Sequence, residues 1–174
     1  MTKEEKIFLR PLKLADAPWI LKWENNTANW LVSGTEKPYS MEEIRTFIRD
    51  AKNVRENRQL RMMVCFESAN EPIGAVDLFE INFEHKRAEV GILIAETEHR
   101  KRGLGLEALL RLEEYAKANF DIVNFFCGIQ SNNASSIRLF EKAGYQRIGT
   151  RRNWYEFGEK KLDEFLYQRI IEKR

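Results

Sequence analysis

The order of apolar and polar residues predicts short strands and helices that alternate along the chain. The apolar run Ile7–Pro11 indicates a first strand that ends at proline. Asp16 is expected to cap a helix that begins with Ala17–Trp19, because proline is tolerated in a first helical turn. Ser40–Glu43 reads as a capping box, and a second helix is expected behind it from the helical spacing of Ile44, Phe47, Ile48 and Ala51.

The middle of the chain predicts three strands, Leu60–Phe66, Pro72–Ile81 and Ala88–Ala95. The last of these is nearly continuous in apolar residues, which is typical of a central strand. The polar segment Asn82–Arg87 has the length of a hairpin connection, so we expect it to join the second and third strands.

The C-terminal half predicts two helices and three strands on the same sheet. The expected elements are a helix over Gly103–Asn119, a strand over Ile122–Ile129, a short helix over Ala134–Ala143, and strands over Tyr145–Tyr155 and Leu162–Ile171. Leu109, Leu112 and Ala116 share one face of the longer helix, and Gly144 is expected to end the shorter one. The whole order indicates an α+β (α/β) fold on one mixed sheet.

Composition restricts the class of protein further. The 174 residues show no repeat, linker or low-complexity stretch, so a single domain over residues 1–174 is expected. A net charge of +2 argues against a dedicated nucleic-acid binder, and no apolar run reaches the roughly 20 residues that would cross a membrane. Residues 1–6 lack the apolar core of a signal peptide, which favours a cytoplasmic protein. Cys65 and Cys127 lie in apolar runs and are expected to be buried thiols.

The segment with the strongest indication of chemistry follows the predicted strand that contains Ile92, Leu93 and Ile94. Its sequence is Arg100, Lys101, Arg102, Gly103, Leu104, Gly105, Leu106. Backbone N–H groups at a helix start lack intrahelical partners, and glycines let an anion approach them closely. This geometry suits the binding of a pyrophosphate, but the same residues are also compatible with a turn that binds no ligand. A Rossmann fingerprint tolerates Ala108 at its third glycine position, but the acid-tipped strand expected about 20 residues later does not follow. The P-loop pattern is absent.

A second segment runs from Asn132 to Tyr145 and joins a strand end to a short amphipathic helix. Local structure alone accounts for its residues: Asn133 as a helix cap, Phe140 as core and Gly144 as a C-terminal cap.

The two segments together resemble the GNAT superfamily of acyl-CoA-dependent N-acetyltransferases. The first matches the family's [QR]-x-x-G-x-[GA] loop at Arg100, Gly103 and Gly105. The second matches N-x-x-[SA]-[IV]-x-x-[YF]-x-[KR]-x-G-[FY] at Asn133, Ser136, Ile137, Phe140, Lys142, Gly144 and Tyr145. The resemblance implies a twisted mixed sheet of about seven strands with about four helices.

The resemblance also implies that acetyl-CoA is the co-substrate, that no metal is needed and that an amine attacks the thioester directly. Its residues for coenzyme A are Ile92, Leu93 and Ile94 in the strand, Arg100–Leu106 in the loop, and Asn133, Ser136 and Phe140 in the second segment. A backbone N–H near Leu93 is expected to polarise the thioester oxygen.

Within the superfamily the chain looks most like the bacterial spermidine/spermine N-acetyltransferases, and it shares features with the acetyltransferases of ribosomal-protein N-termini. The segments that carry the closer resemblance are Leu9–Leu12, Glu24–Asn26, Lys37–Tyr39, Asp77–Asn82 and His85–Glu89. Members of this group are often homo-oligomers.

An alkylammonium, with a pKa of about 10.4, must lose a proton before it can attack, so a general base is required. The candidates are Glu89, Glu80 and Asp77, on the strands that line this site in the superfamily. The usual proton donor to the thiolate is a tyrosine at the position of Phe140, which has no proton to give. Ser135, Ser136, a water molecule and unassisted departure are the alternatives.

The identity of the acceptor is suggested by charge. Residues 67–98 hold eight acids against Lys86 and Arg87, a net charge of −6, which favours a cationic acceptor such as a polyamine. Two alternatives stay open: a protein N-terminal acetyltransferase of the ribosomal-protein type, and a module that binds acyl-CoA without turnover. The expected partners are thus acetyl-CoA and an amine, with no nucleic acid and no membrane.

Overall fold

A computed structural model describes residues 6–33, 35–69 and 71–171. They form one seven-stranded sheet in the order β1-β2-β3-β4-β5-β7-β6. The strands are β1 (Ile7–Pro11), β2 (Leu60–Phe66), β3 (Pro72–Asn82), β4 (Arg87–Ile94), β5 (Asn124–Gln130), β6 (Gln146–Phe157) and β7 (Lys160–Ile170). β4 and β5 are parallel and the other neighbours are antiparallel, so the sheet is mixed as predicted.

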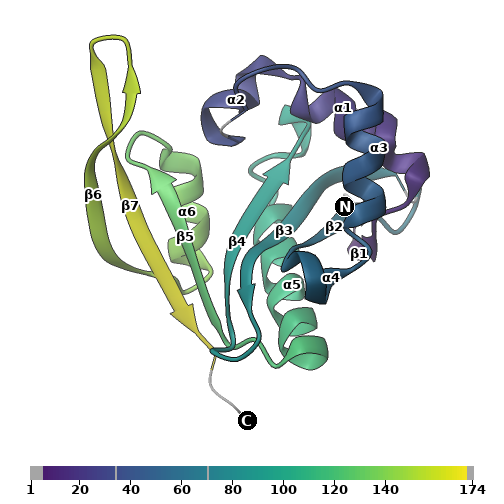
Figure 1. The fold of residues 1–174 in the computed structure, drawn as a ribbon. Helices are drawn as coiled ribbons and strands as arrows, with labels where there is room; N and C mark the ends of the chain where they lie inside the picture. The colour runs from purple at the N-terminus through teal and green to yellow at the C-terminus, as the bar shows by residue number, and fades with distance from the viewer. Residues whose placement is uncertain (1–5, 34, 70, 172–174) are drawn as a thin grey trace, which may run out of the picture.

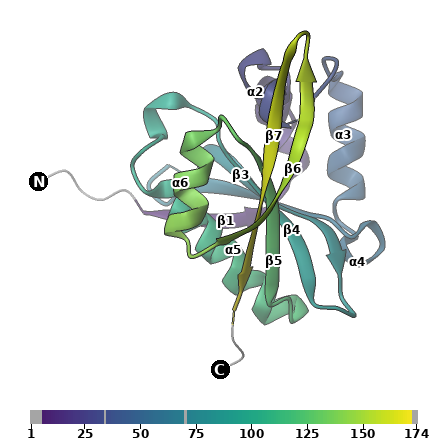
Figure 2. The same ribbon diagram turned by 90° about the vertical axis from the view of Figure 1, so that its left-hand side faces the viewer.

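Helices cover both faces of this sheet (Figures 1 and 2). The α-helices are α1 (Ala17–Glu24), α2 (Thr27–Ser33), α3 (Met41–Asp50), α4 (Val54–Asn57), α5 (Leu104–Phe120) and α6 (Ala134–Lys142), and two short 3₁₀ helices are η1 (Leu14–Asp16) and η2 (Thr97–His99). Figure 2 shows α5 and α6 on one side of the sheet and α3 on the other. The α+β (α/β) prediction with four substantial helices, α1, α3, α5 and α6, is confirmed.

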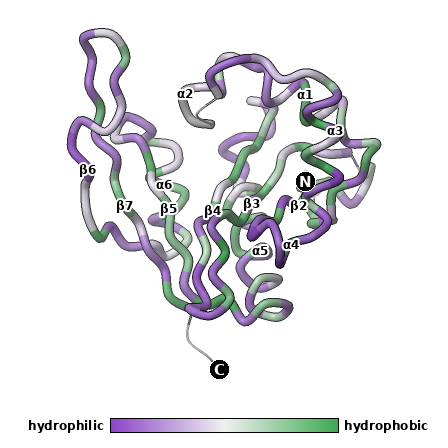
Figure 3. Tube along the Cα trace, viewed as in Figure 1, coloured by the Kyte–Doolittle hydropathy of each residue, from purple (hydrophilic) through white to green (hydrophobic). Residues whose placement is uncertain are grey.

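Two apolar cores hold these layers together. On one face, Leu109, Leu112 and Ala116 of α5 are fully buried against the sheet, as their helical spacing predicts. On the other face, Ile20 of α1 and Ile48 of α3 pack against sheet residues. The tube in Figure 3 is correspondingly hydrophobic along the central strands, whereas much of the β6–β7 hairpin is hydrophilic.

Both cysteines are buried and unbridged, Cys65 in the core under α1 and α3 and Cys127 in the core under α5. The prediction of two buried thiols is therefore confirmed. None of the helices in the described part of the chain combines the length and the apolar composition that crossing a bilayer requires.

Helix caps were predicted with mixed success. The capping box is confirmed, because Ser40 Oγ accepts from Glu43 N at 3.2 Å and Ser40 N donates to the Glu43 carboxylate at 2.7 Å. Gly144 follows α6 with φ +91°, as a C-terminal cap requires. Asp16 occupies the N-cap position of α1, but its side chain does not cap that helix. Its carboxylate is instead held by the Lys13 N–H at 2.8 Å and by Arg10.

Candidate active site

The sheet splits between β4 and β5. Among the described residues the two strands pair only at Arg87–Asn124, Ala88–Phe125 and Glu89–Phe126, near their amino ends. Beyond Glu89, β4 continues to pair with β3, and beyond Phe126, β5 continues to pair with β7. The strands therefore diverge toward their carboxyl ends, which Figure 1 shows as an opening between β4 and β5. We call this region the split.

The alternation of β4 determines which backbone groups face the split. Ala95 N donates to Ile73 O of β3 at 2.9 Å, so Leu93, two residues earlier, also directs its backbone groups toward β3. Ile92 and Ile94 then direct theirs toward the split. The N–H groups of Ile92 and Ile94 are therefore the donors next to Leu93 that face the split, and their contact with a ligand stays a prediction.

The start of α5 lies beside the carboxyl end of β4. Gly103 is its N-cap with φ +83° and has no side chain with which to cap, so the N–H groups of Leu104, Gly105 and Leu106 remain available at the positive end of the helix. A Cβ on Gly105 would meet only ordinary contacts at 3.6–3.7 Å, with Ile92, Ile94 and Leu139. Packing within the chain therefore does not require glycine at position 105, whereas close approach of an anion does.

The basic residues before α5 take different positions. The Arg100 side chain donates to Ile94 O at 2.9 Å and to Ala95 O at 3.1 Å, and its own N–H donates to Thr97 O. Arg100 thus holds the end of β4 in this structure. Lys101 and Arg102 are exposed, and Lys101 has φ +60°, in the turn that leads into the helix.

The second predicted segment forms the start of α6. Asn133 is its N-cap, and the side-chain oxygen of Asn133 accepts from Ser136 N at 3.1 Å. Phe140 is buried in the core with its ring 5.0 Å from that of Tyr145, edge to face. The predictions of Asn133 as a helix cap and Phe140 as a core residue are therefore confirmed. A contact of Asn133, Ser136 or Phe140 with coenzyme A stays a prediction.

Tyr145 donates from its hydroxyl to Glu113 of α5 at 2.6 Å, and Arg169 of β7 also pairs with Glu113. Burial raises the pKa of Glu113 to about 7, although both partners favour the charged form. Glu113 thereby joins α5 to Tyr145 and to β7.

The three predicted acids have distinct surroundings. Glu89, on β4 at the last pair with β5, is half-buried, and burial raises its pKa above the ordinary value, with further contributions from the charges of Glu164 and Glu80. Glu80 is exposed at an irregularity of β3 and has φ +47°.

Asp77 is buried and its carboxylate is held by Arg61 of β2, with Nε to Oδ1 at 2.5 Å and Nη2 to Oδ2 at 3.3 Å. Burial raises the pKa of Asp77, and the guanidinium of Arg61 opposes that effect. The Asp77 carboxylate would have to be released from Arg61 before it could accept a proton. Among the described contacts, no arginine or lysine is hydrogen-bonded to the Glu89 carboxylate.

One carboxylate beside Glu89 was not found from the sequence. Glu164 of β7 is buried, and its oxygens accept from Tyr155 Oη at 2.7 Å and from Arg151 Nη1 at 2.6 Å. A Cβ on Gly128 of β5 would lie 2.4 Å from the Glu164 carboxylate, so the glycine makes room for it. Glu164 lies within the predicted strand Leu162–Ile171, but it follows Lys160, Lys161 and Asp163, so the sequence does not indicate that its side chain is buried.

The arrangement suits the transfer of a group between two ligands. One side offers uncapped helix N–H groups and strand N–H groups in the split, which suit a phosphorylated ligand with an extended arm. The other offers a half-buried carboxylate, Glu89, whose raised pKa suits proton transfer. In the part of the chain that the structure describes, no group of three His, Cys, Asp or Glu side chains is arranged to hold a metal ion.

Comparison with known proteins gives a consistent result. The family model described as "Acetyltransferase (GNAT) domain" matches residues 6–146. Spermidine N(1)-acetyltransferase of Vibrio cholerae is 28% identical over 145 residues, which cover 83% of this chain and 81% of the relative.

Solved structures share the fold. The spermidine N-acetyltransferase of Vibrio cholerae in complex with CoA and spermine superposes with a TM-score of 0.81 at 24% identity, covering 94% of this chain and 95% of the other. Another structure of that enzyme is described as dodecameric. RimL, a ribosomal L7/L12 alpha-N-protein acetyltransferase in complex with coenzyme A, gives a TM-score of 0.82 at 18% identity, covering 95% and 94% of the two chains.

Proposed function

The chain belongs to the GNAT acetyltransferase family, and on that premise we propose that it acetylates a cationic small-molecule amine, with a polyamine as the favoured acceptor. The observation that supports this most is the split of the sheet directly beside the uncapped start of α5. This arrangement would present backbone donors to a phosphorylated ligand on one side of the split and the half-buried Glu89 carboxylate on the other.

Acetyl-CoA supplies the acetyl group as a thioester. The N–H groups of Leu104, Gly105 and Leu106 would hold its pyrophosphate, since Gly103 leaves them uncapped and Gly105 leaves space. The N–H groups of Ile92 and Ile94 would bind the pantetheine arm and polarise the thioester oxygen. Arg100 would act indirectly, by fixing the end of β4, while Lys101 and Arg102 would contribute charge.

Glu89 is the proposed general base. The amine nitrogen attacks the thioester carbon, a C–N bond forms, the C–S bond breaks, and Glu89 accepts the amine proton directly or through water. We favour Glu89 over Asp77 because Arg61 occupies both oxygens of Asp77, and over Glu80 because Glu80 is exposed.

The thiolate that leaves must acquire a proton from another source than Phe140, which is buried and has no acidic proton. Ser135 is exposed and Ser136 half-buried at the start of α6, so both remain candidates beside water.

A cationic acceptor is supported by the carboxylates that act on Glu89 and by similarity to a spermidine N(1)-acetyltransferase. The charges of Glu164 and Glu80 both contribute to the raised pKa of Glu89, and a bound ammonium would offset this repulsion at Glu89. The likeness to RimL keeps a protein N-terminus as the second candidate acceptor. An oligomeric assembly, as described for the Vibrio cholerae enzyme, is also part of the proposal.

The test is an acceptor screen that follows release of free thiol from acetyl-CoA. We expect the wild-type chain to turn over spermidine or spermine faster than neutral amines and faster than peptides. Glu89→Gln should lower kcat by roughly 100-fold or more, because general-base catalysis contributes about 10²–10⁴-fold. An unchanged rate in Glu89→Gln would remove Glu89 from this role.

Equal rates for cationic and neutral amines would contradict the polyamine proposal, and a preference for peptides would favour the N-terminal acetyltransferase. Stabilisation by acetyl-CoA without thiol release for any amine would instead favour the non-catalytic module.

A further inference from the structure

We propose that Arg61 is a positioning residue for the amine acceptor: by bridging Asp77 of β3 and Glu24 at the end of α1, it holds the segment α1–α2 beside the split and so sets acceptor affinity. This inference rests on the proposed function for its kinetic part. Its structural part, that Arg61 anchors α1–α2, is tested separately below.

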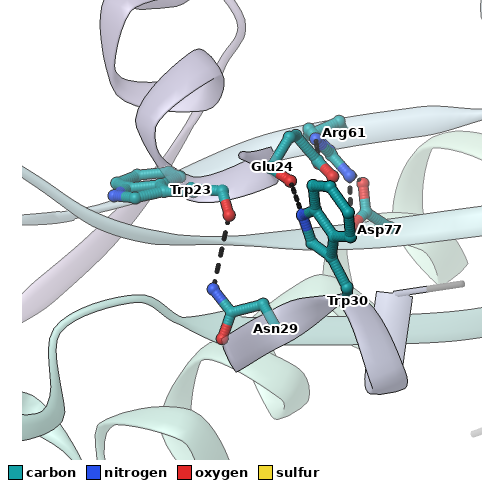
Figure 4. Close-up of polar contacts among 6 residues, drawn as sticks. All are labelled: Trp23, Glu24, Asn29, Trp30, Arg61 and Asp77. Atoms are coloured by element: carbon teal, nitrogen blue, oxygen red, sulfur yellow. Dashed lines mark hydrogen bonds and ion pairs between the residues drawn. The ribbon is translucent and has the colours of Figure 1, made fainter. Parts of the chain in front are cut away.

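The Arg61 guanidinium joins the sheet to the helix layer (Figure 4). Besides the two bonds to Asp77, its Nη1 donates to Glu24 Oε1 at 2.8 Å. The side chains of Arg61 and Glu24 are only 16% and 18% exposed, so the bond is largely screened from water. The Arg61 guanidinium also lies 5.1 Å from the ring centre of Phe47 of α3. One side chain of β2 thus contacts β3, α1 and α3.

The end of α1 in turn holds α2. Trp30 Nε1 of α2 donates to Glu24 O at 2.8 Å, and Asn29 Nδ2 donates to Trp23 O at 3.3 Å (Figure 4). Both bonds terminate on the last turn of α1, the turn that Arg61 fixes to the sheet. A helix of seven residues has little stability of its own, so its placement depends on such tertiary contacts.

This anchored segment lies beside the candidate site. Asp77 pairs with Gly91 of β4, two residues after Glu89 on the same face of the strand. A Cβ on Gly91 would lie 3.6 Å from Asp77 Cβ, which shows how closely the Asp77 side chain approaches β4. Figures 1 and 2 show α2 at the end of the molecule where β4 and β5 have separated. Movement of α1–α2 would therefore alter the acceptor side of the split.

Direct binding of the acceptor by Glu24 or Asp77 would give the opposite prediction for Arg61→Gln. If a cationic acceptor bound Glu24 or Asp77 directly, Arg61 would compete with it, and Arg61→Gln would lower the KM for the acceptor. If Arg61 positions α1–α2, Arg61→Gln raises that KM. The sign of the change separates recognition from positioning.

The kinetic experiment uses the full chain and initial rates with spermidine. Glu24→Leu removes the helix anchor but leaves Arg61 paired with Asp77, so the variant should fold even where Arg61→Gln does not. We expect Glu24→Leu to raise the KM for spermidine about tenfold, which corresponds to the loss of one charge-assisted hydrogen bond. kcat and the KM for acetyl-CoA should stay within about twofold. Glu24→Gln, which retains an acceptor oxygen, should restore part of the affinity.

The matched control is Asp16→Asn, since Asp16 and Arg10 form a comparable pair with side chains 5% and 13% exposed at the other end of α1. We expect Asp16→Asn to reduce stability without a change in acceptor KM. An equal rise of acceptor KM in Asp16→Asn, or a lower acceptor KM in Arg61→Gln, would overturn the inference.

Hydrogen–deuterium exchange of the α2 amides, Thr27–Ser33, tests the anchor without turnover. Exchange should be faster in Glu24→Leu and unchanged in Asp16→Asn. Wild-type exchange in Glu24→Leu would overturn the anchoring role, whatever the activity. A wild-type chain that acetylates no amine would contradict the proposed function while this measurement still decides the anchor.

Discussion

The carboxyl group of Glu89 lies close enough to those of Glu164 and Glu80 for their charges to affect its ionisation. Burial is the largest cause of its raised pKa, the two neighbouring carboxylates add to it, and Arg151 opposes them. Glu89 is therefore converted to its proton-accepting form at a higher pH than an exposed glutamate. If Glu89 is the base, kcat/KM should rise with pH through this raised pKa.

Glu164→Gln should shift that rise to lower pH. The substitution removes the negative charge that contributes most after burial, so the pKa of Glu89 falls and its ionised form persists in more acidic solution. We expect the acid limb of the kcat/KM profile to move to lower pH. Glu71→Gln, a substitution at an exposed residue between β2 and β3, should leave the limb in place. If the acid limb of the profile is unchanged or moves to higher pH in Glu164→Gln, the charge of Glu164 does not raise the pKa of Glu89.

At the residue scale, local patterns in the sequence predicted local structure correctly. The loop around Gly103 and Gly105 forms an uncapped helix start, as its glycines predict. Glu164 escaped prediction because its burial depends on Gly128 and Tyr155, which come from other strands. Arg61 escaped for the same reason, since its two carboxylate partners lie 37 and 16 residues away.

At the scale of elements, β5 and β7 depend on a glycine to place Glu164. The strands pair from Asn124–Ile170 to Gln130–Glu164, and Gly128 lies within that ladder. Its missing side chain lets the Glu164 carboxylate lie across β5, where it meets Tyr155 and Arg151 of β6. Three strands are thus tied together at one carboxylate.

Gly128→Ala should disturb this link. A Cβ at 2.4 Å from the Glu164 carboxylate forces that group to move, and overpacking of this kind costs about 1–3 kcal/mol of the free energy of unfolding. We expect a lower stability in urea unfolding together with a reduced kcat/KM for the acceptor. Gly149→Ala on β6 is the matched control, because its Cβ would lie an ordinary 3.7 Å from Leu166. Equal stability of the two variants would show that the space beside Gly128 is not needed.

Elements with strong local signals were predicted well, and elements placed by individual side-chain contacts were not. The apolar run of β4 and the glycine after α6 gave correct elements to within about two residues. The split between β4 and β5 has no local signal, because Ile92–Ile94 has the composition of a fully paired strand. α2 and α4 were missed; α2 is placed by Trp30 and Asn29 bonding back to α1, which no periodicity reveals.

At the scale of the whole molecule, acids that are neighbours in the sequence do not lie together in space. The acids of residues 67–98 do not gather at one place: Glu67 and Glu71 lie between β2 and β3, and Glu84 lies between β3 and β4 at the opposite end of β3. Glu96 pairs with Lys22 at 2.6 Å. The negative charge that acts on Glu89 comes instead from Glu80 and the distant Glu164. The count of acids along residues 67–98 therefore does not describe the charge around Glu89, to which Glu164 contributes from another strand.

Stability of the whole fold should depend on pH through Glu113, which joins α5 to Tyr145 and β7. Its pKa is about 7 in the folded chain, against an ordinary value of 4.5. Between these values the folded state binds the proton that the unfolded state has released, so the contribution to stability falls as the pH rises from 4.5 to 7 and is constant above that range.

The variant Glu113→Gln isolates this contribution. Gln can still accept from Tyr145 but does not titrate, so its stability relative to wild type should improve with pH by on the order of 3 kcal/mol between pH 4 and pH 8. Urea unfolding of both chains at several pH values measures the difference. Glu114→Gln, at the adjacent exposed position of α5, should show no such trend. A difference for Glu113→Gln that is constant with pH, or that favours wild type at high pH, would mean that Tyr145 and Arg169 outweigh burial and keep Glu113 ionised.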